Sequence, residues 1–168
     1  MKPVIDVGVF RLLGIASFMF ANGLLLTSYG MVTLAIESRR FVDAMGKGSA
    51  TVLLTTFLGL AGISQLVCPV IGFYSDRARS KFGKRRPFIL SGVLVGGFGL
   101  VVQKTARNSM SAQPEGSLVL YSIAFTLSMI ALNFIYTGAS GLIPDLVPER
   151  QIGLANGIVT LAQVRNTQ

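Results

Sequence analysis

The sequence of 168 residues contains no histidine and a single cysteine, Cys68. These absences exclude histidine-based catalysis, an internal disulfide and a zinc site built from cysteine and histidine. Charged residues make up only 13% of the chain, whereas roughly 25% is usual in a soluble domain. We therefore expect neither an enzyme nor a cofactor or metal site.

The few charges are mostly basic, because fifteen lysines and arginines stand against seven acids, for a net charge of +8. A nucleic-acid-binding protein carries such charge on a polar surface, but 51% of this chain is hydrophobic. In an apolar chain, an excess of lysine and arginine is typical of the cytoplasmic loops of membrane proteins. We expect a lipid bilayer around the chain and no nucleic-acid partner.

Long uncharged runs separate the charge clusters. A helix needs about 20 apolar residues to cross a bilayer. Three runs exceed this length, and the short run 87–103 is expected to gain a turn from its basic flank. We predict an all-α, polytopic transmembrane helix bundle, a single partial domain over residues 1–168. Its spans are 12–36, 48–75, 87–103 and 116–144, with a truncated fifth from 151.

A large soluble protein and a secretory signal fit these runs less well. Buried core helices of a soluble protein would not be expected to follow one another four times without a charge. A secretory signal has an apolar part of only about 7–15 residues, which is shorter than the run 12–36.

The distribution of lysine and arginine predicts the orientation in the membrane. Nine of these residues flank the chain start, the 77–86 loop and the end of the fourth span, and five lie on the opposite side. The more basic side is cytoplasmic by the positive-inside rule. We therefore expect an integral, multi-pass protein with a cytoplasmic N-terminus.

The segment 72–89 is the most specific feature of the sequence. Gly72 would let another helix approach closely, and Gly83 would allow a tight turn. Pro87 suits the first turn of a helix. Asp76 is one acid among six bases at a predicted helix C-terminus, where an acid is unfavourable, so we expect it to have a partner.

This pattern of glycine, Asp-Arg, a second glycine and a basic run resembles the cytoplasmic loop signature of the major facilitator superfamily. Its ending, Phe-Gly-Lys-Arg-Arg-Pro-Phe-Ile, is most similar to the sucrose transporter and glycoside–pentoside–hexuronide cation symporter branch. The segment 142–157 resembles the loop after the fourth span in the same branch. The resemblance implies a conformational gating role for Gly72, Asp76, Arg77, Gly83, Arg85, Arg86, Asp145, Glu149 and Arg150.

The resemblance also implies what the whole protein does. Members have twelve spans in two halves, so this chain would supply most of the N-terminal half and would need the missing C-terminal half as its partner. The implied function is transport of a small organic solute, a sugar or glycoside, by alternating access. The alternatives are a non-sugar exporter of the same superfamily and a truncated membrane protein that does not transport.

The chain departs from the branch at the positions that couple transport to a cation. Met129 and Cys68 stand where members carry aspartates, and Ser140 stands where the plant transporters carry an arginine. All seven acids also lie outside the uncharged runs. We therefore expect the coupling residue to lie in the missing half, or the protein to be a facilitator.

Polar side chains inside the runs are the candidate substrate-binding residues. Thr126, Asn133 and Tyr136 share one helical face by their spacing, and Asn22 and Gln65 lie in the first two spans. Amides, hydroxyls and an aromatic ring suit a hydroxyl-rich ligand. The same groups could instead bond helices to one another, and the sequence leaves both readings open.

Glycines in the third run have a simpler interpretation. Gly92 and Gly96 have the spacing that allows close contact between two membrane helices, and Gly97 and Gly99 follow. We predict that these glycines mark helix packing rather than a binding site.

Overall fold

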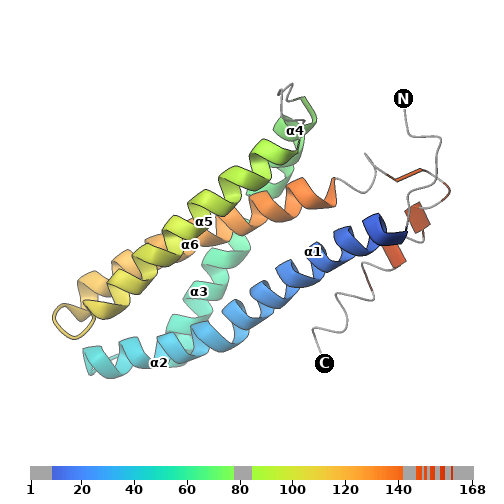
Figure 1. The fold of residues 1–168 in the computed structure, drawn as a ribbon. Coiled ribbons are helices and arrows are strands. Elements are labelled where there is room, and N and C mark those ends of the chain that lie inside the picture. The colour runs from blue at the N-terminus through green and yellow to red at the C-terminus, as the bar shows by residue number, and fades with distance from the viewer. Residues whose placement is uncertain are drawn as a thin grey trace.

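The computed structural model is a bundle of long helices (Figure 1). The structure describes residues 9–77, 85–141, 147–148, 150, 152–153, 156–157 and 160. Gly83, Asp145 and Glu149 and most of the predicted fifth span lie outside these residues.

The first long helix runs without a break in three parts: α1 (Val9–Thr27), the π-helical turn η1 (Ser28–Thr33) and α2 (Leu34–Met45). It ends at Gly46, whose φ of 64° is left-handed and favours glycine. The helix therefore continues well past Ile36, where the uncharged run stops.

The second long helix has a break in its middle. α3 (Ala50–Ser64) and α4 (Val67–Arg77) are separated by a turn at Gln65 and Leu66. Pro69 has no backbone N–H to give to the Gln65 carbonyl. That carbonyl accepts the N–H of Cys68 instead, at 2.9 Å.

The last two long helices are α5 (Arg86–Asn108) and α6 (Pro114–Ser140). Pro87 lies in the first turn of α5, which confirms the expectation for this proline. α5 begins at Arg86 and continues past Lys104 to Asn108, so the short run 87–103 gains most of its added length at its far end.

Helices α5 and α6 lie side by side along their length (Figure 1). A Cβ atom at Gly92 would lie 2.7 Å from Ile135 Cγ1 and 2.8 Å from the Ala131 carbonyl oxygen. One at Gly96 would lie 3.3 Å from Ala131 Cβ, and Gly99 is buried against Ser128. The predicted packing role is confirmed for these three glycines, while Gly97 faces open space.

An aromatic cluster holds α2, α3 and α6 together. The Tyr121 ring lies 5.3 Å from Phe41 and 5.6 Å from Phe57, and Phe57 lies 5.3 Å from Phe125, all edge to face. Such pairs add stability beyond the area that they bury. This cluster forms the core of the bundle.

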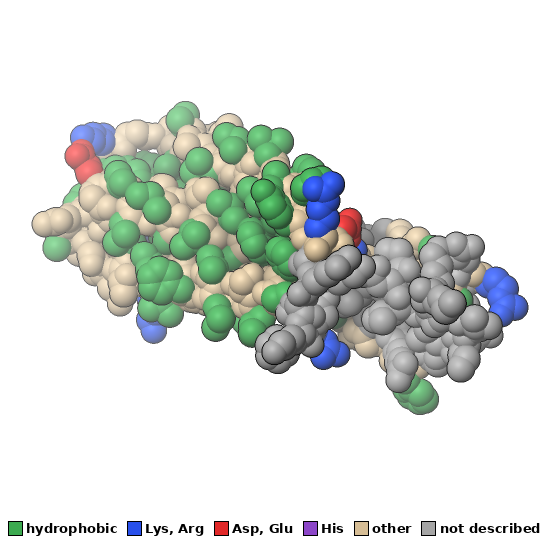
Figure 2. Space-filling view, turned by 90° about the horizontal axis from the view of Figure 1, so that it is seen from above, with side chains coloured by type: hydrophobic (Ala, Val, Ile, Leu, Met, Phe, Trp, Pro, Cys, Tyr) green, Lys and Arg blue, Asp and Glu red, His purple; other side chains and the backbone are tan. Residues whose placement is uncertain are grey.

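In the described part of the chain, four helical segments are long and apolar enough to cross a bilayer. They overlap the four predicted spans, and much of their apolar surface faces outward, as Figure 2 shows for one face. The segments are Ala16–Met45, Ala50–Arg77, Arg86–Asn108 and Pro114–Ser140.

The first of these segments extends past its uncharged run, and Glu37 in this extension is buried. Glu37 ends the uncharged run. Arg40 of α2 and Arg107 of α5 pair with its carboxylate, and the helix continues past it.

Candidate functional site

The residues of the 72–89 pattern bring together the ends of three helices around Arg85. Arg85 Nη2 lies 2.7 Å from Asp76 Oδ1, and Arg85 Nη1 donates a hydrogen bond to Ser75 Oγ at 3.1 Å. The expected partner of Asp76 is therefore an arginine. The Arg85 side chain is only 11% exposed, whereas that of Asp76 is 64% exposed.

The Arg85 guanidinium also packs against the end of α6. A Cβ atom at Gly141 would lie 2.6 Å from Arg85 Nη1 and 2.7 Å from Nε, so only glycine leaves room for the arginine. α4 and α6 both end here, and helix C-termini carry partial negative charge. We call Ser75, Asp76, Arg85 and Gly141 the Arg85 clamp, because the cation holds two helix ends together.

Four more of the predicted gating residues lie in the described part of the chain. Arg77 stacks on the Phe73 ring, with Cζ 3.8 Å from the ring centroid, and Arg86 and Arg150 are exposed. Gly72 faces α6, but a Cβ atom there would lie at an ordinary 3.9 Å from Thr137 Cγ2. α6 therefore does lie against Gly72, at a distance that also has room for the methyl group of an alanine.

The candidate substrate residues do not all gather in one place. Asn133 Nδ2 donates to Ser64 Oγ at 3.0 Å, which joins α6 to the end of α3 beside Gln65. Thr126 Oγ1 donates to the Ser122 carbonyl of its own helix at 2.9 Å. Tyr136 and Gln65 are exposed and Asn22 is half-buried.

A polar network that the sequence did not predict lies on the other side of α6. Gln103 of α5 accepts a hydrogen bond from the Tyr29 hydroxyl of η1. Its amide donates to Ser128 Oγ at 2.9 Å and to the Ala124 carbonyl at 3.3 Å. Gln103 is the last residue of its uncharged run, and this position was the only signal that could have drawn attention to it.

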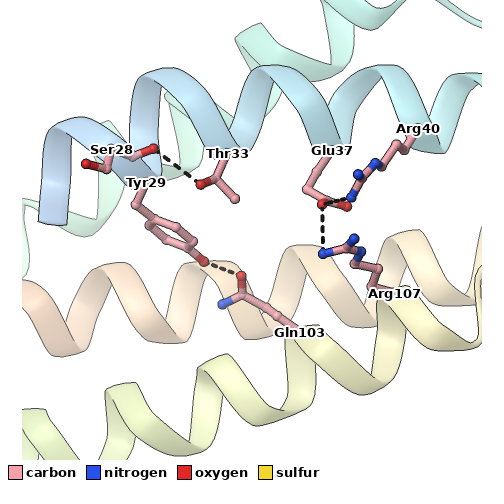
Figure 3. Close-up of polar contacts among 7 residues, drawn as sticks. All are labelled: Ser28, Tyr29, Thr33, Glu37, Arg40, Gln103 and Arg107. Atoms are coloured by element: carbon pink, nitrogen blue, oxygen red, sulfur yellow. Dashed lines mark hydrogen bonds and ion pairs between the residues drawn. The ribbon is translucent and has the colours of Figure 1, made fainter.

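Two exposed arginines pair with the buried Glu37 about one helical turn along α5 from this network (Figure 3). Glu37 Oε1 lies 2.9 Å from Arg40 Nη1 on the same helix and 3.6 Å from Arg107 Nη1 on α5. Arg107 follows Gln103 by one helical turn, so the two features share a face of α5.

A cleft of about 360 Å³ opens between α1, η1, α5 and α6. Its walls are mainly apolar side chains and glycines, with the polar groups Tyr29 and Ser128 on one side. Thr126, Asn133 and Tyr136 do not line it. Within the described residues, no group of three or more histidine, cysteine or acidic side chains is arranged to hold a metal.

The sequence is similar to sugar transport proteins. It is 30% identical to a sucrose transport protein of rice (Oryza sativa subsp. japonica) over 86% of this chain and 28% of that protein. It is 31% identical to a sucrose transport protein of Arabidopsis thaliana over 72% of this chain and 22% of that protein.

A third relative is fungal. The general alpha-glucoside permease of Schizosaccharomyces pombe is 33% identical over 58% of this chain and 18% of that protein. The chain thus spans 18–28% of the length of these relatives. No family model and no solved structure matches the sequence.

These relatives, the four membrane-length helices and the loop pattern around Arg85 agree with one another. The helices and the relatives together make the chain an integral, multi-pass membrane protein. The chain belongs to the sucrose-transporter-like branch of the major facilitator superfamily.

Proposed function

We propose that the chain forms the first four spans of the N-terminal half of a sugar transporter, as a single partial transmembrane domain. The observation that carries this proposal is the match to transporters named for sucrose and alpha-glucosides. The solute we propose is therefore a sucrose-like or α-linked glucoside. Because the chain spans 18–28% of these relatives, transport would also need the region that corresponds to the rest of their length.

The Arg85 clamp supports a gating role at the cytoplasmic side. The lysine and arginine distribution predicts that the 77–86 loop and the chain start are cytoplasmic. Arg85 packs against the ends of α4 and α6, while Asp76 is paired with it and is 64% exposed. A second half that packed on this end would meet Asp76 first, so the carboxylate would favour the conformation that is closed to the cytoplasm.

We place the substrate contacts on the face of α6 that carries Thr126, Asn133 and Tyr136. Asn133 donates one amide hydrogen to Ser64. Its amide oxygen and its other amide hydrogen can then bond to a hydroxyl-rich solute. Gln65 lies next to Ser64 at the break between α3 and α4, where it could reach the same solute. Asn22 on α1 completes the proposed set.

The experiment that tests this function is sugar counterflow with the full-length protein in proteoliposomes. Vesicles loaded with unlabelled sucrose should take up labelled sucrose, and maltose should compete for it while an amino acid should not. An Asn133→Ala variant should raise KM for the sugar. Correctly inserted protein that exchanges no α-glucoside would reject the proposed function.

A further inference from the structure

Glu37 is a buried acid whose two carboxylate oxygens have different surroundings. Its side chain is 4% exposed and lies on α2, the charged continuation of the first long helix beyond the uncharged run 12–36. Oε1 forms ion pairs with Arg40 and Arg107, whereas Oε2 is buried with no hydrogen-bond partner among the described residues. A buried carboxylate oxygen without a donor is costly.

The two arginines differ from the carboxylate in their access to water. The side chains of Arg40 and Arg107 are 43% and 51% exposed, so water can solvate each guanidinium if Glu37 loses its charge. The neutral carboxylic acid can stay buried. Protonation of Glu37 would therefore leave no unpaired charge in the interior, and the exposed arginines provide the side from which a proton can enter.

The remaining neighbours do not supply a competing acid or base. Arg40 is on α2 itself and Arg107 is on α5. The phenols of Tyr29 on η1 and Tyr121 on α6 lie near enough to interact electrostatically with Glu37. α3, which packs against α2, contains no titratable residue.

We propose that Glu37 is a proton-binding site that couples proton movement to transport. A proton adds to the buried Oε2 and forms a neutral carboxylic acid, and no other covalent bond changes. The ion pair that joins α2 to Arg107 of α5 is then lost, and it forms again when the proton leaves. The proposal rests on the proposed transport function, and it replaces the expectation that no residue of this chain takes part in coupling.

The test compares Glu37→Gln with Asp43→Asn in the full-length protein in proteoliposomes. Asp43 is exposed on the same helix and is the matched control. With an inward gradient of about one pH unit, the wild type and Asp43→Asn should accumulate sugar about tenfold. Glu37→Gln should not accumulate it but should keep sugar counterflow at equal pH. Accumulation that survives in Glu37→Gln would overturn the proposal.

A second measurement decides the case in which Glu37→Gln fails to fold. Infrared difference spectra of the wild type between alkaline and acidic pH should contain the carbonyl band of a buried carboxylic acid, and Glu37→Asp should shift that band. A spectrum without such a band would overturn the proposal. Wild-type protein that shows the band but exchanges no sugar would instead reject the proposed function.

Discussion

At the scale of single residues, the charge on Asp76 is the simplest part of the Arg85 clamp to test. Asp76→Asn keeps the size of the side chain but removes the ion pair with Arg85. Because Asp76 is largely exposed, stability should change little. If the pair biases the conformational equilibrium, the initial rate of sugar uptake should fall about tenfold, with normal insertion. Unchanged uptake kinetics would remove the gating role.

Gly141 tests the same clamp from the other side. In Gly141→Ala, the new methyl group would overlap the Arg85 guanidinium, which would have to leave its present position in the clamp. We predict slower uptake, as for Asp76→Asn. Gly72→Ala is the matched control, because its methyl group fits at 3.9 Å from Thr137 Cγ2. Equal uptake rates in the two alanine variants would contradict this role of Gly141.

Asn133 can join α6 to α3 through Ser64, contact the sugar, or do both. A double-mutant cycle with Ser64, together with the KM of each single variant, separates these roles. The hydrogen bond between them should contribute about 0.6 kcal/mol, and at most about 1.7 kcal/mol, to stability in detergent. If Asn133 also binds sugar, Asn133→Ala should raise KM while Ser64→Ala leaves it nearly unchanged. Equal KM values in the two variants would restrict Asn133 to a structural role.

At the scale of elements, the contact between α5 and α6 depends on which side of α5 each glycine occupies. Gly92→Ala should destabilise the bundle by about 1–3 kcal/mol, because its Cβ would overlap Ile135 and the Ala131 carbonyl. Gly97→Ala, on the same helix but facing open space, should be neutral or slightly stabilising. Thermal unfolding in detergent measures both, and equal melting temperatures would contradict the assigned interface.

The sequence predicted the elements better than their ends. Uncharged runs located the four long helices because a bilayer requires apolar length, and Pro87 and the Gly92–Gly99 stripe could be interpreted from local chemistry. The extension of α2 past Glu37 could not be predicted, since it depends on Arg107, which is distant in the chain. The same kind of long-range pairing explains why the hydrogen bond between Asn133 and Ser64 could not be predicted from the sequence.

At the scale of the whole molecule, the two ends of the bundle have different chemistry. The connections after α2 and before α6 lie at one end, where Lys47 Nζ donates to Glu115 Oε1 at 2.6 Å (Figure 1). This hydrogen bond raises the pKa of the exposed Lys47 ammonium above its usual value. The Arg85 clamp lies at the opposite end. A bundle that crosses the membrane would therefore expose the clamp and the Lys47–Glu115 pair to different compartments.

The membrane topology is the most direct test of the proposed orientation and of the gating role that depends on it. Single cysteines at Ser80 and Ser111, each in a Cys68→Ser background, would be labelled with an impermeant reagent. We predict that Ser80 is labelled only from the cytoplasm and Ser111 only from outside. Labelling of Ser80 from outside would place the Arg85 clamp on the wrong side of the membrane and contradict both the orientation and the proposed gating role.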